Sequence, residues 1–414
     1  MGDAIPAAAP VWSNDMRVAV TGSSGFIGAH VVDRLLDAGH EVRALDLAPG
    51  GPDTRADHQV VDVLDLEAVA DALDGCDAIF HLAGMSNVDL AFADPVGTVR
   101  LNVEGTGNVC EAARRAGVRR VLFASTVWVY GAVPKGGAAK LGAGGPGGAG
   151  LLEDAHIELA RAGHVYTSTK LAAELLLHSY RETYGLPFTI LRYGIPYGPG
   201  MRDELVLARF VAHAAAGEPL TVAGDGRQFR RYVYVRDLAD AHVRALTTPG
   251  AENATIALEG AERISVLDMA EAVRTHFPDA KIEHVPARPG DYRGREVSAE
   301  RAARLLDWRP TTSFQDGVRQ YVEWYQTERA EHGRAGVAGR AGRAGGPSEA
   351  GRRPAPPVPA APTEKASGPT EKGAAGESAR QNGAPATPSA TSPATPPATP
   401  PARRPGIAAT PAER

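Results

Sequence analysis

The stretch Arg17-Val-Ala-Val-Thr-Gly-Ser-Ser-Gly-Phe-Ile-Gly28 decides the fold class of this chain. Its first residues, Arg17 to Val20, have the apolar character of a buried strand, and Ile27, Val31 and Leu35 then follow a helical period. A strand that turns on glycines into a helix leaves backbone N–H groups and the positive end of the helix dipole facing outward, ready for a pyrophosphate. The stretch therefore predicts a dinucleotide site rather than an ordinary strand-to-helix turn.

The glycines of the turn have separate tasks in such a site. Gly22 allows the tight turn, Gly25 lets the phosphates approach the backbone, and Gly28 lets the helix pack closely on the strand. The other residues expected to contact the cofactor here are Ser24, Phe26 and Ile27.

The first half of the chain alternates short apolar runs with helical patterns. Strands are expected at 17–21, 41–46, 58–62, 77–82, 119–124 and 188–192, and helices at 26–38, 66–73, 96–117 and 165–184. This repeated alternation is typical of a parallel sheet covered by helices on both faces. The sequence therefore predicts an α/β fold, with a Rossmann-type doubly wound parallel sheet over residues 16–192.

The second half is more mixed and predicts a smaller C-terminal α/β lobe that binds the substrate, mainly over residues 193–330. Strands are expected near 220–222, 231–235, 254–258 and 281–285, between helices near 203–216, 237–246, 265–276, 298–306 and 313–328. In open α/β sheets, ligands bind beyond the carboxyl ends of the strands, so a cleft between the lobes is expected there.

Three segments lie outside this pattern. Residues 331–414 form a tail rich in Ala, Gly and Pro, without an aromatic residue from Gly333 onward. The tail cannot bury enough apolar surface to offset its ordering entropy and is predicted to be disordered, and residues 1–15 are expected to be an unstructured extension. The glycine-rich loop 135–150 is interpreted as a surface insertion, with a mobile lid over the substrate as the alternative.

Charge and composition argue against several partners. The net charge is −5, and because the tail is basic, the body before it is more acidic still, which argues against nucleic acid as a partner. The two cysteines, Cys76 and Cys110, show no metal-ligand spacing and no disulfide framework. The sequence contains no run of about 18 apolar residues, so no membrane association is expected and the chain is predicted to be cytoplasmic.

The second predicted strand ends in Asp46, about 20 residues past the glycine turn. A carboxylate there can accept hydrogen bonds from both hydroxyls of the adenosine ribose but would repel a 2′-phosphate, and the next residue is Leu47 rather than an arginine. The cofactor is therefore expected to be NAD rather than NADP. Asp62 could bind the adenine amino group with Val63 beside it, or could simply end a strand as a turn residue.

Tyr166 and Lys170 are four residues apart at the start of a predicted helix and therefore lie on one face. The strand that ends at Ser125 and Thr126 reaches the same edge of the sheet, so three groups can converge on one substrate oxygen. A free tyrosine, with a pKa of about 10, is a poor base, but a nearby lysine and an oxidised nicotinamide would both favour its phenolate. We expect Tyr166 to be the general base and Lys170 to bind the nicotinamide ribose as well. Thr126, or else Ser125, would hydrogen-bond the hydroxyl that is oxidised.

These residues together resemble the extended short-chain dehydrogenase/reductase family, the NAD-dependent epimerases and dehydratases of nucleotide sugars. The resemblance covers nearly all of residues 17–328. Its motifs stand here as Thr21-Gly-Ser-Ser-Gly-Phe-Ile-Gly28, His81-Leu-Ala-Gly84, Asn102-Val-Glu-Gly-Thr106, Ser125-Thr-Val-Trp-Val-Tyr-Gly131, Tyr166 with Lys170, Arg192 with Tyr197-Gly-Pro199, Gly224-Asp-Gly-Arg-Gln228, Arg288-Pro-Gly-Asp291 and Trp308-Arg-Pro310. So many motifs in the family's order make the resemblance specific.

The resemblance implies further site residues. Leu82, Ala83 and Gly84 would line the nicotinamide side of the cofactor. Arg230 and Arg288 would hold the pyrophosphate of a nucleotide-sugar substrate, a task that suits arginine because its fork matches phosphate oxygens.

Besides the Arg230-Arg231-Tyr232 that stands for the family's usual Arg-Asp-Phe, the chain departs from the family's pattern at two places that bear on its chemistry. The dehydratases carry Asp-Glu after the catalytic threonine, whereas this chain has Val127 and Trp128, so dehydration lacks its acid and base. Where the family usually has an asparagine that contacts the nucleotide sugar, this chain has Ile195, which weakens the sugar-nucleotide assignment. The chemistry that remains needs only reversible hydride transfer.

The leading hypothesis is an NAD-dependent nucleotide-sugar epimerase, most similar to the UDP-glucose 4-epimerases. The family further implies a homodimer joined through the helices near 96–117 and 165–184. The alternative is an NAD-dependent dehydrogenase or reductase of another alcohol or ketone. A third hypothesis is a non-catalytic dinucleotide-sensing or scaffold protein, but a sensor needs none of Thr126, Tyr166 and Lys170.

Overall fold

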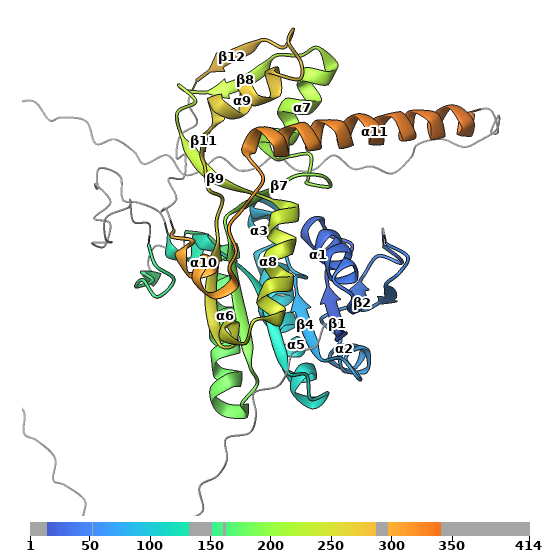
Figure 1. The fold of residues 1–414 in the computed structure, drawn as a ribbon, viewed down its shortest axis with the longest axis vertical. Helices are drawn as coiled ribbons and strands as arrows, with labels where there is room; N and C mark the ends of the chain where they lie inside the picture. The colour runs from blue at the N-terminus through green and yellow to red at the C-terminus, as the bar shows by residue number, and fades with distance from the viewer. Residues whose placement is uncertain (1–14, 52, 132–150, 160–162, 287–296, 341–414) are drawn as a thin grey trace, which may run out of the picture. The chain divides into compact units, whose positions relative to one another are not determined.

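The computed structural model describes residues 15–51, 53–131, 151–159, 163–286 and 297–340, all within one compact unit (Figure 1). The predictions for residues 1–14, for the loop 135–150, for Arg288 and for the tail beyond 340 concern residues outside this description. Among the described helices, none is both long enough and apolar enough to cross a membrane.

A seven-stranded parallel sheet forms the centre of the fold. In spatial order its strands are β10 (Ala254–Leu258), β6 (Phe188–Tyr193), β5 (Arg120–Thr126), β4 (Ala78–His81), β1 (Arg17–Thr21), β2 (Glu41–Asp46) and β3 (Asp57–Val60). The chain runs outward from β1 through β2 and β3 and then crosses to β4 on the other side of β1. The switch point of the topology therefore lies between β1 and β4, where α/β sheets bind ligands. The doubly wound Rossmann-type fold is confirmed.

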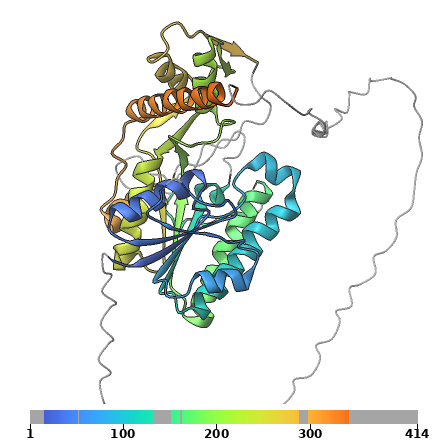
Figure 2. The same cartoon turned by 90° about the vertical axis from the view of Figure 1, so that its right-hand side faces the viewer.

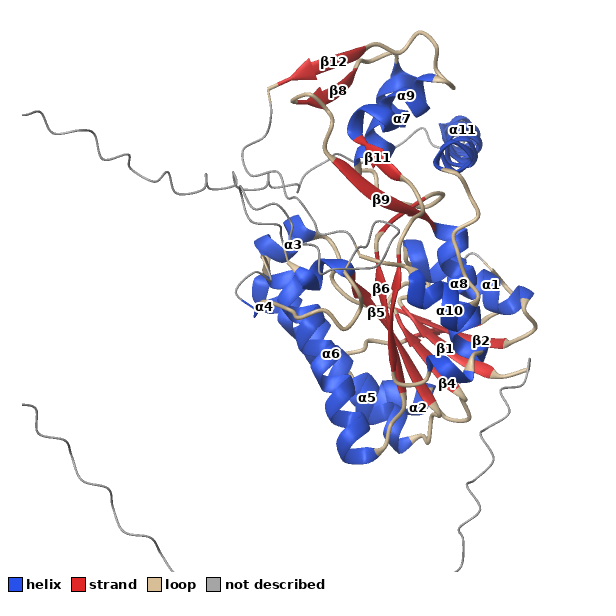
Figure 3. Ribbon diagram, turned by 60° about the vertical axis from the view of Figure 1, so that its left-hand side comes forward, coloured by secondary structure: helices blue, strands red, loops and turns tan. Residues whose placement is uncertain are grey.

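Helices cover both faces of the sheet (Figure 3). One face carries α1 (Phe26–Asp37), α8 (Val235–Thr247) and α10 (Glu300–Leu306), and the other carries α2 (Leu66–Ala72), α5 (Gly105–Arg115) and α6 (Val165–Tyr184). The strands serve both layers because successive side chains point to opposite faces. Val18 and Val20 of β1 pack with the first layer, and Ala19 between them packs with the second.

Several elements from the second half of the chain, among them β10, α8 and α10, belong to this body rather than to the smaller lobe. β10 pairs with β6, and α8 packs on the face that carries α1. Ile256 of β10 and Leu238 of α8 are buried in the same core as Leu35 of α1. The boundary between the two lobes expected at residue 193 is therefore the point where the chain first leaves the large sheet. The chain later returns to that sheet with β10.

The smaller lobe is built from short strands and the helices that cover them (Figures 1 and 2). β7 (Ile195–Tyr197), β9 (Phe229–Tyr234) and β11 (Arg263–Ser265) form one sheet, β8 (Leu220–Ala223) pairs with β12 (Ile282–Val285), and α7 (Val206–Ala216), α9 (Val266–Arg274) and α11 (Phe314–Arg340) complete the lobe. α9 begins at a capping box formed by Ser265 and Asp268. α11 continues to Arg340, past its expected end at residue 328 and into the tail predicted to be disordered from residue 331. The Ala, Arg and Glu residues there favour helix, although three glycines lie among them.

The helix expected over 96–117 is divided in the structure. α3 (Val88–Ala93) and α4 (Pro95–Val99) precede a π-helical turn, η1 (Arg100–Glu104), and α5 follows; the remaining short helices are the 3-10 turns η2 (Val127–Tyr130) and η4 (Pro249–Ala251). The amide of Asn102 in the π turn accepts from the Met85 N–H (2.7 Å) and donates to the Thr169 hydroxyl on α6 (2.9 Å). The sequence predicted one continuous helix because a single π turn leaves little mark on the apolar periodicity.

Candidate active site

The glycine turn after β1 has the geometry that a pyrophosphate site requires. Gly22 has a φ of +69°, which favours glycine, and a Cβ on Gly28 would come within 2.0 Å of the Gly22 carbonyl oxygen. Gly25 is the N-cap of α1 and offers no side chain to the first N–H groups of that helix. These groups therefore stay available to an anion.

A cavity of about 590 Å³ opens beside this turn. Its walls include all but one of the residues predicted for the cofactor: Gly22, Gly25, Phe26, Ile27, Gly28, Asp46, Asp62, Val63, Leu82, Ala83, Gly84, Tyr166 and Lys170. The exception is Ser24, whose hydroxyl donates to the Gly50 carbonyl oxygen (3.1 Å). The cavity has the volume of a typical small-molecule or cofactor site.

Asp46, at the end of β2, is held in place by backbone groups. Its carboxylate accepts from the Ser24 N–H (3.0 Å) and from the Ala48 N–H (3.1 Å). Each oxygen keeps a lone pair for a ribose hydroxyl, and the negative charge disfavours a 2′-phosphate. The residues present therefore fit NAD.

The position of Asp62 is consistent with both predicted roles, a turn residue after a strand and a ligand of the adenine. β3 ends at Val60, so Asp62 lies in the turn beyond the strand, where its Oδ1 accepts from the Leu64 N–H (2.9 Å). Asp62 and Val63 also line the cavity. The turn that Asp62 stabilises is thus part of the cavity wall.

Tyr166, Lys170 and Thr126 converge on the same cavity. Thr126 is the last residue of β5, and Tyr166 and Lys170 lie at the start of α6. The buried Lys170 ammonium donates to the Ala124 carbonyl oxygen (2.9 Å) and lies 4.8 Å from the centre of the Phe123 ring. The structure brings together the three groups that the sequence predicted to converge.

The surroundings of these groups raise one pKa and lower another. Removal from water raises the pKa of Tyr166 to about 12, although a hydrogen bond with Thr126 and the charge of Arg202 lower it. Burial lowers the pKa of Lys170 to about 8, against the carboxylate of Glu174, which raises it. Tyr166 therefore stays protonated at neutral pH unless more positive charge arrives, and an oxidised nicotinamide would bring such a charge.

Ser125 and Thr126, the two candidates for bonding the substrate hydroxyl, differ in the structure. The Ser125 hydroxyl is buried and donates to Glu174 Oε1 (2.5 Å). Thr126 Oγ1 accepts from the Trp128 N–H (3.2 Å) and takes part in the hydrogen bond with Tyr166. The geometry favours Thr126, because the proton of Ser125 is already committed.

Sequence reasoning missed two residues near Tyr166. Arg202 is exposed and lines the cavity. His164 caps α6 by accepting from the Thr167 N–H (3.3 Å), and its ring stacks on the Tyr166 ring with centres 5.9 Å apart. Two signals could have found them: Arg202 closely follows the Tyr197-Gly-Pro199 motif, and His164 stands at the helix start before Tyr166.

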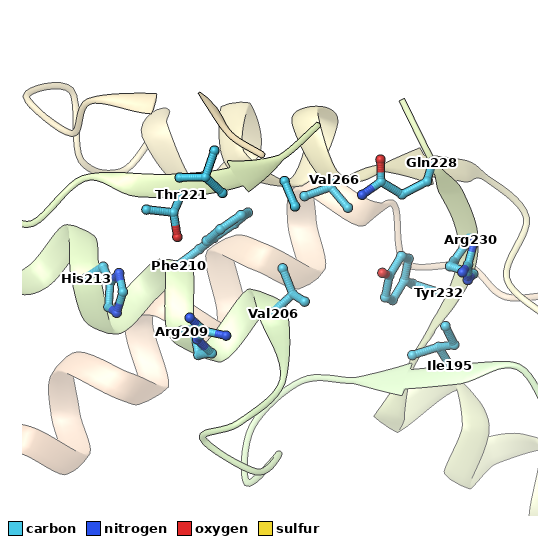
Figure 4. Close-up of a pocket in the computed structure, with 12 residues that line it drawn as sticks. Ile195, Val206, Arg209, Phe210, His213, Thr221, Gln228, Arg230, Tyr232 and Val266 are labelled. Carbon is cyan, nitrogen blue, oxygen red and sulfur yellow. The ribbon is translucent and has the colours of Figure 1, made fainter. Parts of the chain in front are cut away.

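A second pocket of about 260 Å³ lies in the smaller lobe and shares Ile195 with the cofactor cavity (Figure 4). Arg230 of β9 lies in its wall, and α7 presents Arg209 and His213, four residues apart on one face, to the same pocket. Basic groups in a pocket next to a cofactor cavity suit the phosphates of a nucleotide. Arg288, the other predicted phosphate ligand, lies outside the described residues.

Fold and site together define the class of this protein. A Rossmann sheet with a glycine turn, an acid at the end of β2 and a Tyr-Lys pair beside the cavity is the arrangement of a nicotinamide-dependent enzyme of the short-chain dehydrogenase/reductase type. The chain belongs to the NAD dependent epimerase/dehydratase family, whose family model matches residues 18–257. Its cofactor is accordingly NAD.

Known relatives cover about three quarters of the chain. The UDP-glucose 4-epimerase of Mycolicibacterium smegmatis is 33% identical over 331 residues, which span 76% of this chain and 99% of the relative. The solved UDP-glucose 4-epimerase of Thermus thermophilus, a complex with NAD, is 31% identical with a TM-score of 0.63, over 75% of this chain and 99% of that one. UDP-glucuronic acid 4-epimerase from Bacillus cereus, solved with UDP-glucuronic acid and NAD, is 26% identical with a TM-score of 0.65, over 76% of this chain and 100% of that one.

Proposed function

We propose that this chain is an NAD-dependent 4-epimerase of a UDP-sugar. The observation that carries the proposal is the convergence of Thr126, Tyr166 and Lys170 on the cofactor cavity. The glycine turn and Asp46 would hold NAD in the cavity, where it would supply a reversible acceptor for the C4 hydride of the sugar. Tyr166 removes the proton of the 4-hydroxyl, Thr126 holds that oxygen by a hydrogen bond, and the charge of Lys170 stabilises the phenolate. Tyr166 gives the proton back after the keto sugar has turned its other face to the cofactor.

The lining of the cavity supports epimerisation over dehydration. Val127 and Trp128 stand where a dehydratase of this family carries its acids. Among the described residues that line the cavity, the only carboxylates are Asp46 and Asp62, which we assign to the adenosine. No acid is therefore left there for the removal of water from a sugar.

The second pocket supports the assignment of a nucleoside diphosphate sugar as the substrate. Its wall carries Arg209 and Arg230, and Ile195 belongs to both pockets, so one ligand can extend from the cofactor cavity to these cations. The Bacillus cereus relative holds UDP-glucuronic acid together with NAD. We assign the sugar to the cofactor cavity and the UDP group to the second pocket.

One experiment distinguishes this function from its alternative. The purified protein is heat-denatured, the released nicotinamide cofactor is quantified, and UDP- and dTDP-sugars are incubated with the native protein and followed by NMR. We expect stoichiometric bound NAD and a 4-epimeric product without net NADH. An empty cofactor site with net NADH formation would instead support a dehydrogenase of another alcohol, which the apolar Ile195 favours.

Replacement of Arg230 by alanine is expected to weaken UDP binding about tenfold or more, because a charge-assisted bond to phosphate is lost. Isothermal titration calorimetry with UDP measures the change. Arg227 is exposed and does not line the pocket, so R227A is the matched control and should bind UDP as the wild type does. Equal UDP affinity in R230A and R227A would remove Arg230 from the substrate site.

We further propose that the protein acts as a homodimer. Exposed apolar side chains occur on the helices from which the family resemblance predicts the interface: Val96 and Val99 of α4 and Leu175 of α6. Apolar side chains grouped on a surface commonly mark a protein interface. The cytoplasmic location stays a prediction.

A further inference from the structure

A buried ion pair lies next to the catalytic groups. Glu174 follows Lys170 by one turn of α6, and its side chain is only 3% exposed. Its carboxylate accepts from Arg192 Nε (2.9 Å) and Nη2 (2.5 Å) on β6 and from the Ser125 hydroxyl (2.5 Å) on β5. One carboxylate therefore ties α6 to two neighbouring strands of the sheet.

The register of the sheet explains why these groups meet. Ser125 and Arg192 are opposite each other in the pairing of β5 with β6. Arg192 also donates from Nη1 to the Tyr130 hydroxyl (2.6 Å) and to the Glu153 carbonyl oxygen (3.0 Å). The Arg192 guanidinium thus has hydrogen-bond partners besides Glu174. A buried ion pair needs such additional bonds, because they offset the cost of removing its charges from water.

Few charged groups in the described part of the chain face the Lys170 ammonium. Glu174 approaches it from the same helix, with the positive charge of Arg192 beyond that carboxylate. His81 faces it from β4 and is neutral, because burial lowers its pKa to about 3. Tyr166, one turn earlier on α6, is protonated. Glu174 is thus the negative charge that offsets the burial of Lys170.

We propose that Glu174 is a positioning residue for the reaction and acts through Lys170 and Ser125. The inference rests on the proposed function. The hydrogen bonds of Glu174 fix the position of α6 along the end of β5. This position places Tyr166 beside Thr126. Its charge keeps the lysine ionised where the phenolate needs it. Glu174 itself does not line the cavity, so it acts without touching the reacting atoms.

The variant E174Q tests the charge. It keeps the shape of the side chain but removes the negative charge and leaves Arg192 unneutralised, and both changes lower the pKa of Lys170. Since Lys170 must be protonated, the basic limb of the kcat profile is expected to move to lower pH by about one unit. At pH values above both limbs, kcat of E174Q should be about tenfold below that of the wild type, with KM little changed. E182Q, at an exposed position of the same helix, is the matched control and should keep the wild-type limb.

The variant E174D separates charge from geometry. Aspartate keeps the negative charge but withdraws the carboxylate by one methylene from Ser125 and Arg192. We expect a lower kcat with the basic limb left in place. Thermal melting will show whether E174Q folds. If it does not, E174D provides the test, because a displaced basic limb in E174D would contradict the role assigned to the charge.

The pH dependence of NAD affinity is a second readout that needs no sugar. Lys170 lines the cofactor cavity, so the basic limb of NAD binding, followed by tryptophan fluorescence, should move in E174Q as the kcat limb does. If the basic limb of NAD binding lay at the same pH in wild type and in folded E174Q, the proposal would be overturned, however much less stable the variant were. A wild type that binds NAD but epimerises no sugar would contradict the proposed function instead, and the binding profile would still decide the role of Glu174.

Discussion

Tyr166→Phe is expected to lose a factor of about 10² to 10⁴ in turnover while it still binds NAD. The substitution removes only the hydroxyl, which bonds with Thr126 at the cavity wall, and keeps the ring that stacks on His164. Lys170 cannot take over as the base, because with a pKa of about 8 it is mostly protonated at neutral pH. Turnover of a UDP-sugar by NMR and NAD released on denaturation measure the two halves of this prediction.

Tyr180→Phe is the matched control for this experiment. Tyr180 lies on the same helix, is partly buried and packs against the core, outside the cavity lining. Its variant should keep wild-type turnover within about twofold. If Y166F turned over substrate as fast as Y180F does, the general base would have to be sought elsewhere.

Gly28→Ala is expected to abolish NAD binding and to lower stability. The new methyl group would lie 2.0 Å from the Gly22 carbonyl oxygen, which belongs to the backbone and cannot swing away. The start of α1 must then shift from β1, at a cost of about 1–3 kcal/mol, and the N–H groups that face the pyrophosphate shift with it. Thermal melting and calorimetric titration with NAD measure the two effects.

Gly107→Ala is the control that separates this contact from the general effect of replacing a helical glycine. A Cβ at Gly107 on α5 meets nothing within 4 Å. Alanine there should leave NAD affinity unchanged and raise stability by about 0.4–1 kcal/mol. A G28A protein with wild-type NAD affinity would mean that the turn does not hold the pyrophosphate.

Much of the fold could be predicted because the signals are local. The glycine turn, the alternation of apolar runs with helical periods and the acid that ends β2 each depend on residues close together in the chain. Such signals predicted the parallel sheet, the start and end of α6, and the residues of the glycine turn, Asp46, Asp62, Tyr166 and Lys170 that line the cavity. They did not predict the π turn around Asn102 or the return of β10 to the sheet, because tertiary contacts select both.

The sequence by itself determined that this chain is an NAD-binding α/β enzyme with a Tyr166 and Lys170 pair on one helix face, since spacing along a helix and order along a sheet are enough for that. Only the tertiary structure favours Thr126 over Ser125 as the residue that would bond the substrate hydroxyl, because it shows the Ser125 hydroxyl bonded to Glu174, 49 positions away. It also decided the protonation of the site. Burial is a property of the packed molecule, and burial raises the pKa of Tyr166 and makes Lys170 depend on the charge of Glu174.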